Sequence, residues 1–364
     1  MGSWPTCGRV ARRPTFVLVA PPGARLGGGL LQPDAGAAAL ERAGSVLQLD
    51  LPAVPEERRA EAFGEAVGEA DAVVFAPWGA FGVGELSPAC WSAAERLRVI
   101  AGTFDNRFER IFGLSLAQVS DRGITVVDTS RSMTPTVAEF ALAMILNLLR
   151  DIPAAVASMR AGEWDVAWPD VPGAVTGDLS GRRVGLAGFG VICRRLADLL
   201  APFACELRAF DPYVGADDLA AAGVGRADSL GELAAWSEIF VVGIPPTPAT
   251  RGIIDAAVIG ALPRGSLFVL PTRMAVVDQE ALWARTRAGE LRAAVDVYDP
   301  EPPAPEAPFR TDRNVLPTPH MAGNTSAAHH RCFTTACAEA VAALEGRGLR
   351  YAMTPVDAAA YAGR

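Results

Sequence analysis

Short apolar segments alternate with helical stretches along most of the chain, and this alternation restricts the fold more than any other feature. A strand that is apolar on both faces must be covered on both faces, so the pattern predicts parallel sheets flanked by helices, an α/β fold. With 364 residues, half of them hydrophobic, the chain exceeds what one core usually holds, and we expect two such domains. The expected strands form two series, Thr15–Ala20, Val46–Asp50, Ala72–Ala76, Arg98–Ala101 and Thr125–Asp128, then Arg183–Gly188, Glu206–Phe210, Ile239–Ile244, Leu267–Pro271, Ala293–Tyr298 and Val315–Thr318.

A long apolar helix is predicted between the two series, over Thr134–Arg150. It opens with a Thr cap, a Pro in its first turn and a Glu soon after, which are signals of a helix start. A helix this apolar must be buried, between domains or at a subunit contact.

Composition excludes several classes of protein. The net charge is -8 and all 33 basic residues are Arg, with no basic block, so nucleic acid is not an expected partner. Apolar runs fall short of the roughly 18 residues of a membrane span, and the apolar run after residues 1–13 is too short for a signal peptide, so we expect a loose tail there. Six scattered Cys without a CxxC pair predict reduced thiols in the cytoplasm and no metal site.

A glycine-rich turn follows the first strand of the second series. Gly188 allows a tight turn, Gly190 lets the backbone approach a pyrophosphate, and the helix that follows offers free N–H groups. Asp211 lies 21 residues after Gly190, at the end of the next strand, where a carboxylate accepts ribose hydroxyls and repels a 2′-phosphate. The pattern predicts NAD; an ordinary βαβ crossover is the alternative. Cys193 replaces the usual third Gly, and we expect a small shift of the helix.

Three polar residues at strand ends of the second series suit the reduction of a ketone. Hydride transfer leaves negative charge on oxygen, so the site needs a proton donor, and His320 follows an apolar strand. Glu301, just past the preceding strand, is the expected partner of its ring. Arg273, after another strand, offers a planar fork for a carboxylate and a keto oxygen. Each residue alone is more often structural, and their shared position at one sheet edge favours a catalytic site.

Together these motifs resemble those of the D-isomer-specific 2-hydroxyacid dehydrogenases, the family of D-lactate, glyoxylate/hydroxypyruvate and phosphoglycerate dehydrogenases. The resemblance covers about Arg98 to Asn324 well and the N-terminal part loosely. It is carried by Thr136–Phe140, Val184–Asp211, Pro245–Gly252, Thr272–Arg273 with Val277–Asp278, Asp296–Pro302 and Pro319–His320.

The resemblance implies an NAD-dependent oxidoreductase that transfers a hydride between nicotinamide and C2 of a small 2-hydroxy or 2-keto acid. Arg273, Glu301 and His320 would be its catalytic residues. It also implies two Rossmann-like or flavodoxin-like domains with the active site in a cleft, a substrate-binding domain over 14–130 completed by 322–364, an NAD-binding domain over 131–321, and a homodimer. The implied cofactor contacts are Gly188, Phe189, Gly190, Val191, Ile192, Asp211, Pro212, Pro245, Thr250, Thr272, Asp296 (by the nicotinamide carboxamide), His320 and Gly323.

The chain departs from the family pattern at the turn whose backbone N–H groups bind the substrate carboxylate in relatives. The family's Gly-x-Gly-x-Asp turn is replaced by Gly102-Thr-Phe-Asp-Asn-Arg107, without the second Gly, and Met274 follows Arg273 where Gly is usual. We therefore hypothesise that side chains grip a second polar or anionic group of the substrate. A surface role for Arg107, paired with Asp105 or Glu109, is the alternative. The candidate substrate-binding residues are Trp78, Gly102, Thr103, Phe104, Asn106, Arg107 and Arg273.

Two other functions share this fold. A binding protein that keeps NAD as a conformational sensor, like the corepressors that resemble these dehydrogenases, is the main rival, because fold does not settle function. Formate dehydrogenases come last, because their family pattern pairs the His with Gln and this chain has Glu301.

Overall fold

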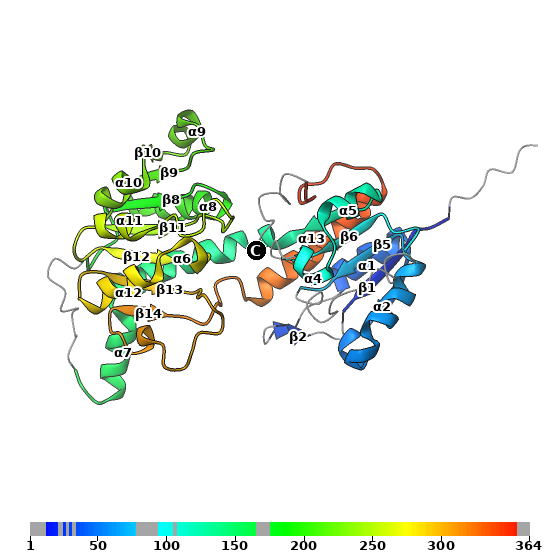
Figure 1. Cartoon of the computed structure of the whole chain (residues 1–364), viewed down its shortest axis with the longest axis horizontal. Coiled ribbons are helices and arrows are strands. Elements are labelled where there is room, and N and C mark those ends of the chain that lie inside the picture. Colours follow the sequence, from blue (N-terminus) through cyan, green and yellow to red (C-terminus); the bar gives the residue numbers. More distant parts are fainter. Residues whose placement is uncertain are drawn as a thin grey trace, which may run out of the picture. The chain divides into compact units, whose positions relative to one another are not determined.

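The computed structural model of the chain describes residues 12–20, 25–26, 29–30, 34–77, 94–104, 108–164 and 175–354. They form two compact units (Figure 1). The first unit combines the chain up to Ser132 with the part from Ser326 onward, and the second spans Met133–Thr325. These boundaries lie two and four residues beyond the expected ones at 130 and 321.

The first unit is built on a five-stranded parallel sheet with the order β4-β1-β5-β6-β7. Alternate residues of its strands serve two cores, as the period of two requires. Val17, Val73 and Ile100 face one core, and Phe16, Val74 and Ala101 face the other, which α13 covers. Its elements are β1 (Thr15–Val19), β2 (Arg25–Leu26), β3 (Gly29–Leu30), α1 (Asp34–Ala43), β4 (Ser45–Leu49), α2 (Arg59–Gly68), β5 (Ala72–Phe75), β6 (Val99–Gly102), α4 (Phe108–Phe112), α5 (Leu116–Asp121), β7 (Thr125–Asp128) and α13 (Ser326–Leu344).

The second unit holds a seven-stranded parallel sheet with the order β10-β9-β8-β11-β12-β13-β14. The chain order reverses between β8 and β11, and ligands of open α/β sheets bind outside the carboxyl ends of strands at such a switch point. Its elements are α6 (Thr134–Arg150), α7 (Ile152–Arg160), β8 (Arg183–Ala187), α8 (Val191–Leu200), β9 (Glu206–Phe210), α9 (Ala216–Ala221), β10 (Gly225–Arg226), α10 (Leu230–Trp236), β11 (Ile239–Val242), α11 (Ala256–Ala261), β12 (Leu267–Leu270), α12 (Gln279–Arg287), β13 (Arg292–Val295) and β14 (Val315–Pro317).

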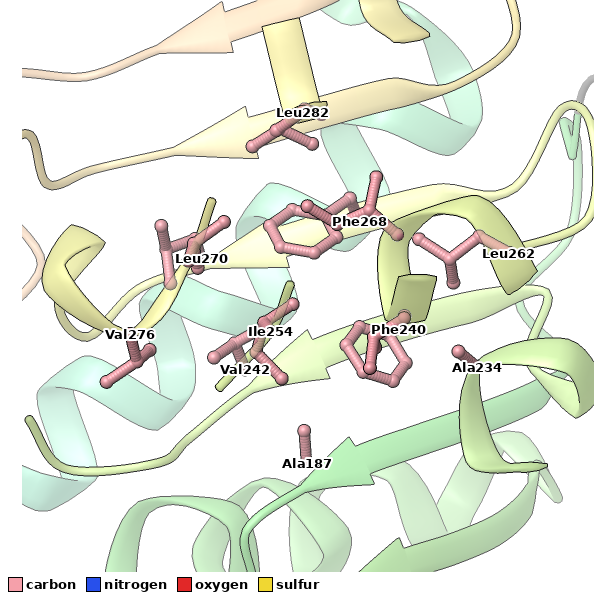
Figure 2. Packing of buried hydrophobic residues seen from close by; sticks show 14 of the residues in the cluster. Ala187, Ala234, Phe240, Val242, Ile254, Leu262, Phe268, Leu270, Val276 and Leu282 are labelled. Atoms are coloured by element: carbon pink, nitrogen blue, oxygen red, sulfur yellow. The ribbon is translucent and has the colours of Figure 1, made fainter. Parts of the chain in front are cut away.

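Apolar side chains pack on both faces of the second sheet. On one face, Phe240 and Phe268 stack with their ring centroids 5.9 Å apart, between Ala234, Leu262 and the other residues in Figure 2. The opposite face packs against α6 and α8. Both faces are covered, as continuous apolar strands require.

The apolar face of α6 lies in this second core, where Ala141, Ile145 and Leu148 are buried. Among the described residues, Thr129–Arg150 is the one stretch with the length and composition of a membrane span. Packing of this helix against the sheet accounts for its apolar character. Its carboxyl end is fixed by Arg292 of β13, a buried side chain that donates to the carbonyl of Leu148 and pairs with Asp151 at 3.0 Å.

Candidate active site

The glycine-rich turn between β8 and α8 has the shape that a bound dinucleotide needs. Gly188 has a φ of +87°, and a Cβ there would approach the backbone of Gly243 at 3.2 Å, so a side chain is excluded. Gly190 is the N-cap of α8, and a Cβ there would meet nothing within 4 Å. The space in front of the first turn of α8 is therefore open. Free N–H groups beside this space suit a pyrophosphate.

Asp211, directly after β9, closes the turn on one side. Its Oδ2 accepts a hydrogen bond from the backbone N–H of Phe189 at 2.8 Å, and its Oδ1 accepts from that of Tyr213 at 2.9 Å. Each carboxylate oxygen has a further lone pair, so the group can still accept ribose hydroxyls. Val191 and Tyr213, which follow β8 and β9, have exposed side chains. The residues present fit NAD.

Cys193 obtains its space from Gly243. The thiol is buried, and a Cβ on Gly243 would come within 3.0 Å of Sγ, a separation that real Cβ atoms essentially never show. The third Gly of the fingerprint is thus replaced by Cys193, and a missing side chain on the neighbouring strand end leaves room for it. Burial, followed by the charge of Asp211, raises the pKa of the thiol to about 12, so it stays protonated.

The other expected cofactor residues support loops of the second unit. Thr250 Oγ1 donates to the carbonyl of Pro245 at 2.6 Å and closes the loop after β11. Thr272 Oγ1 donates to the carbonyl of Val242 at 2.9 Å and joins the ends of β12 and β11. A Cβ on Gly323 would meet Met133 Sδ at 3.1 Å. Contact of these residues with the cofactor stays a prediction, as it does for Ile192 and Pro212.

The three expected catalytic residues follow three neighbouring strands. Arg273 comes after β12, Glu301 after β13 and His320 after β14. His320 Nδ1 lies 2.7 Å from Glu301 Oε2, and about a third of each side chain is exposed, 37% and 35%. An ionised Glu301 only accepts hydrogen bonds, so Nδ1 carries the proton and Nε2 is the atom that can exchange a proton with a ligand. Arg273 Nη1 donates to the carbonyl of Thr272 at 2.7 Å.

Asp296 supports the loop that carries His320. It is fully buried at the end of β13, and it accepts hydrogen bonds from Thr318 Oγ1 at 2.6 Å and from the backbone N–H groups of Met321 and Ala322 at 2.9 and 2.8 Å. These bonds hold the backbone on both sides of His320. The expected contact with the nicotinamide carboxamide stays a prediction.

In the first unit, Thr103 and Phe104 are buried, and their contact with a substrate stays a prediction. Thr103 Oγ1 is 3.1 Å from Thr129 Oγ1, and the ring of Phe104 packs edge-on against Phe75 and Phe108. The backbone N–H of Phe104 donates to Asp128 Oδ1 at 3.1 Å. Both side chains thus hold the loop after β6 in place.

Gly102, the last residue of β6, is also buried, with Phe75 and Phe104 beside it. The other substrate candidates, Trp78, Asn106 and Arg107, lie outside the described residues.

Sequence reasoning missed two residues of the second unit. Gly243 is one, and its signal was a Gly directly after a buried strand that runs beside the fingerprint strand. Tyr298 is the other: its N–H donates to Glu301 Oε1 at 2.8 Å. A large polar residue between Asp296 and Glu301 was the signal for it.

Known proteins share both the sequence and the fold. Residues 142–322 match the family described as D-isomer specific 2-hydroxyacid dehydrogenase, NAD binding domain. A D-3-phosphoglycerate dehydrogenase of Methanocaldococcus jannaschii is 30% identical over 258 residues, 70% of this chain and 47% of that protein. A phosphoglycerate oxidoreductase from Rhizobium etli has a TM-score of 0.70 and 26% identity, and covers 94% of this chain and 98% of its own.

The fold extends to a more distant structure, the apo D-mandelate dehydrogenase of Rhodotorula graminis. It has a TM-score of 0.76 at 22% identity and covers 94% of this chain and 98% of its own. By contrast, the chain spans about half the length of the curated relatives it matches.

The open turn before α8 and the acid at the end of β9 make the second unit a Rossmann-type NAD-binding domain. The comparisons narrow that class, because the match runs from within α6 to the residues just after His320. The chain belongs to the D-isomer-specific 2-hydroxyacid dehydrogenase family.

Proposed function

We propose that this chain transfers a hydride between NAD and C2 of a small D-2-hydroxy acid or the matching 2-keto acid, with His320 and Glu301 as its acid–base pair. The observation that carries the proposal is the 2.7 Å contact between His320 Nδ1 and Glu301 Oε2 at the carboxyl edge of the NAD-binding sheet. A carboxylate on Nδ1 fixes the orientation of the ring and leaves Nε2 as the atom that can exchange a proton with the substrate oxygen.

When reduced NAD is bound, C2 of the substrate would accept its hydride in the direction of reduction. His320 gives the proton on Nε2 to the former keto oxygen and keeps the proton on Nδ1, which stays bonded to Glu301. Arg273 binds the substrate carboxylate through its planar guanidinium, whose paired N–H groups match the two carboxylate oxygens. In the direction of oxidation, the neutral ring of His320 accepts the hydroxyl proton.

The decisive experiment replaces His320 by Ala. We expect kcat to fall by about two to four orders of magnitude, because a lost proton donor acts on the transition state, while NADH still binds, as followed by fluorescence. The same change at His330, on α13 in the first unit, is the matched control and leaves kcat unchanged. A His320→Ala variant that keeps more than about a tenth of wild-type turnover refutes the assignment.

The same assay separates the enzyme from its rivals. A protein that only senses NAD binds NADH but turns over none of a panel of 2-keto acids. A formate dehydrogenase oxidises formate, which Glu301 in place of Gln argues against.

For the substrate, we propose an acid with a second anionic group beyond the 2-keto carboxylate. Support comes from the curated relatives, which are named for D-3-phosphoglycerate, and from Arg107 in the altered turn after Gly102. The panel therefore includes pyruvate, a dicarboxylic and a phosphorylated 2-keto acid. Arg107→Ala should lose activity on the larger anions only, and equal small losses on all three acids would exclude this role.

We further propose that two copies of the chain pair through α7. This helix has no buried residue, and the exposed side chains of Ile152, Val156 and Met159 repeat at helical spacing along it. A contiguous apolar stripe of this kind is typical of protein interfaces. Val156→Asp should convert a dimer to a monomer in sedimentation analysis; a wild-type monomer would contradict the pairing.

We also place the protein in the cytoplasm. Support comes from Cys193, Cys205, Cys332 and Cys337, which are free thiols in the described part of the chain. Localisation of a tagged chain in cells tests this placement.

A further inference from the structure

The backbone of His320 adopts a conformation that needs support. Its φ is +49°, in the left-handed region, where a residue with a side chain is strained by about 1–2 kcal/mol. Such a conformation persists only when neighbouring groups fix the backbone around it.

Thr318, two residues earlier, is held at three points. Its N–H donates to the carbonyl of Val295 at 2.9 Å, and its Oγ1 donates to Asp296 Oδ1 at 2.6 Å. Its carbonyl accepts both the N–H of His320 at 3.1 Å and the hydroxyl of Tyr298 at 3.0 Å. The hydroxyl of Tyr298 therefore contacts the carbonyl from which the left-handed turn at His320 begins.

The ring of Tyr298 is itself fixed by aromatic packing. It stacks on Phe309 with the centroids 4.9 Å apart and the planes 13° apart, and Phe309 stacks on Trp283 at 5.0 Å. Burial, followed by the charge of Asp296, raises the pKa of the phenol to about 12, so the hydroxyl keeps its proton and acts as donor. Its two acceptors are the carbonyls of Thr318 and Val295, each at 3.0 Å.

Tyr298 also contacts the other member of the acid–base pair. Its backbone N–H donates to Glu301 Oε1 at 2.8 Å, while Glu301 Oε2 faces His320 Nδ1. One residue thus joins the loop of His320 through its side chain and the carboxylate of Glu301 through its backbone.

We propose that the hydroxyl of Tyr298 is a positioning group for His320, which keeps Nδ1 of the ring against Glu301. This inference rests on the proposed function, in which His320 is the proton donor.

Tyr298→Phe is a clean test, because the fold does not depend on the hydroxyl. Without it, the carbonyl of Thr318 keeps the N–H of His320, and the carbonyl of Val295 keeps the N–H of Thr318. No buried acceptor loses its last partner, and the stacked ring remains. We expect kcat to fall about five- to tenfold, the size of one hydrogen bond, with NADH affinity and the melting temperature unchanged.

Tyr351→Phe is the matched control, since it removes one hydroxyl from the first unit and should leave kcat unchanged. A second readout does not depend on activity. The chain has three His, so the ring Cε1–H resonance of His320 is assigned by its absence from the spectrum of His320→Ala. In Tyr298→Phe this resonance should shift or broaden, while those of His329 and His330 stay in place.

A Tyr298→Phe variant with wild-type kcat, or with an unmoved His320 resonance, overturns the inference. High turnover in His320→Ala overturns the proposed function instead, and in that case the resonance alone decides whether Tyr298 positions the ring.

Discussion

The packing of Cys193 against Gly243 predicts the effect of one added methyl group. In Gly243→Ala the new Cβ would lie within 3.0 Å of the buried Sγ of Cys193. Overpacking of this kind costs about 1–3 kcal/mol. For a unit of about 190 residues, each kcal/mol lowers the melting temperature by about 2–4 °C, so we expect a loss of about 2–12 °C. NADH binding should weaken too, because the N–H of Gly243 donates to the carbonyl of Ala187 at 2.8 Å, directly before Gly188 of the cofactor turn.

The double variant Cys193→Ala/Gly243→Ala isolates the contact. With Sγ removed, the atoms nearest to the new Cβ are the carbonyl oxygen of Ala187 at 3.6 Å and the Cβ of residue 193 at 3.7 Å, both ordinary van der Waals distances. The double variant should therefore lose only what Cys193→Ala loses alone, about 1 kcal/mol for one buried atom, and should bind NADH as tightly as that single variant.

The wild type, Gly243→Ala, Cys193→Ala and the double variant form a double-mutant cycle, which thermal unfolding and NADH fluorescence titration measure. We expect an interaction energy of about 1–3 kcal/mol. Gly260→Ala is the control, because a Cβ there meets nothing within 4 Å. If the two substitutions add to within about 0.5 kcal/mol, Gly243 does not provide the room for the thiol.

Three further predictions concern the second unit. Asp211→Ala should narrow the NADH-to-NADPH ratio of kcat/KM, and an unchanged ratio would remove Asp211 from the ribose site. Burial raises the pKa of Glu238, but a backbone hydrogen bond and Arg182 at 2.9 Å outweigh burial and bring it below its ordinary 4.5. The ionised Glu238 therefore stabilises the folded state fully above about pH 4.5, and this stabilisation is lost as the pH falls through its lower pKa in the folded protein. In Glu238→Gln, the free energy of unfolding should depend less on pH in that range. Arg292→Met leaves Asp151 without its buried partner and should lower the free energy of unfolding in urea by about 3 kcal/mol. An unchanged free energy of unfolding would show that the pair does not stabilise the fold.

Hydrophobic pattern predicted the sheets well. Every expected strand, from Thr15–Ala20 to Val315–Thr318, overlaps a strand of the structure, because most of them are apolar runs whose side chains lie in a core. The short strands β2, β3 and β10 have two residues each and no such run, so pattern could not reveal them. Arg292 begins β13 although it is charged, because Leu148 and Asp151 of another element compensate its burial.

The sequence predicted those site residues whose position in space follows from their place at the end of a strand. His320 and Glu301 follow neighbouring strands, so their side chains could be expected at one edge of the sheet. Thr103 shows the limit: its hydroxyl bonds to that of Thr129, 26 residues later in the chain, and no sequence pattern predicted this pair. The direction in which a side chain points depends on partners that are distant in the sequence, and a single sequence does not reveal which residues those are.

The packing of α13 on the first sheet has a consequence for the order of folding during synthesis. Phe333, Ala336, Cys337 and Ala340 complete the core of a unit whose strands end at Asp128, yet they follow the whole NAD-binding unit in the chain. A ribosome delivers the NAD-binding unit before this helix, and domains fold as units when their residues have emerged. We therefore expect the unit that begins first to finish last, with one face of its five strands open to chaperones until α13 arrives.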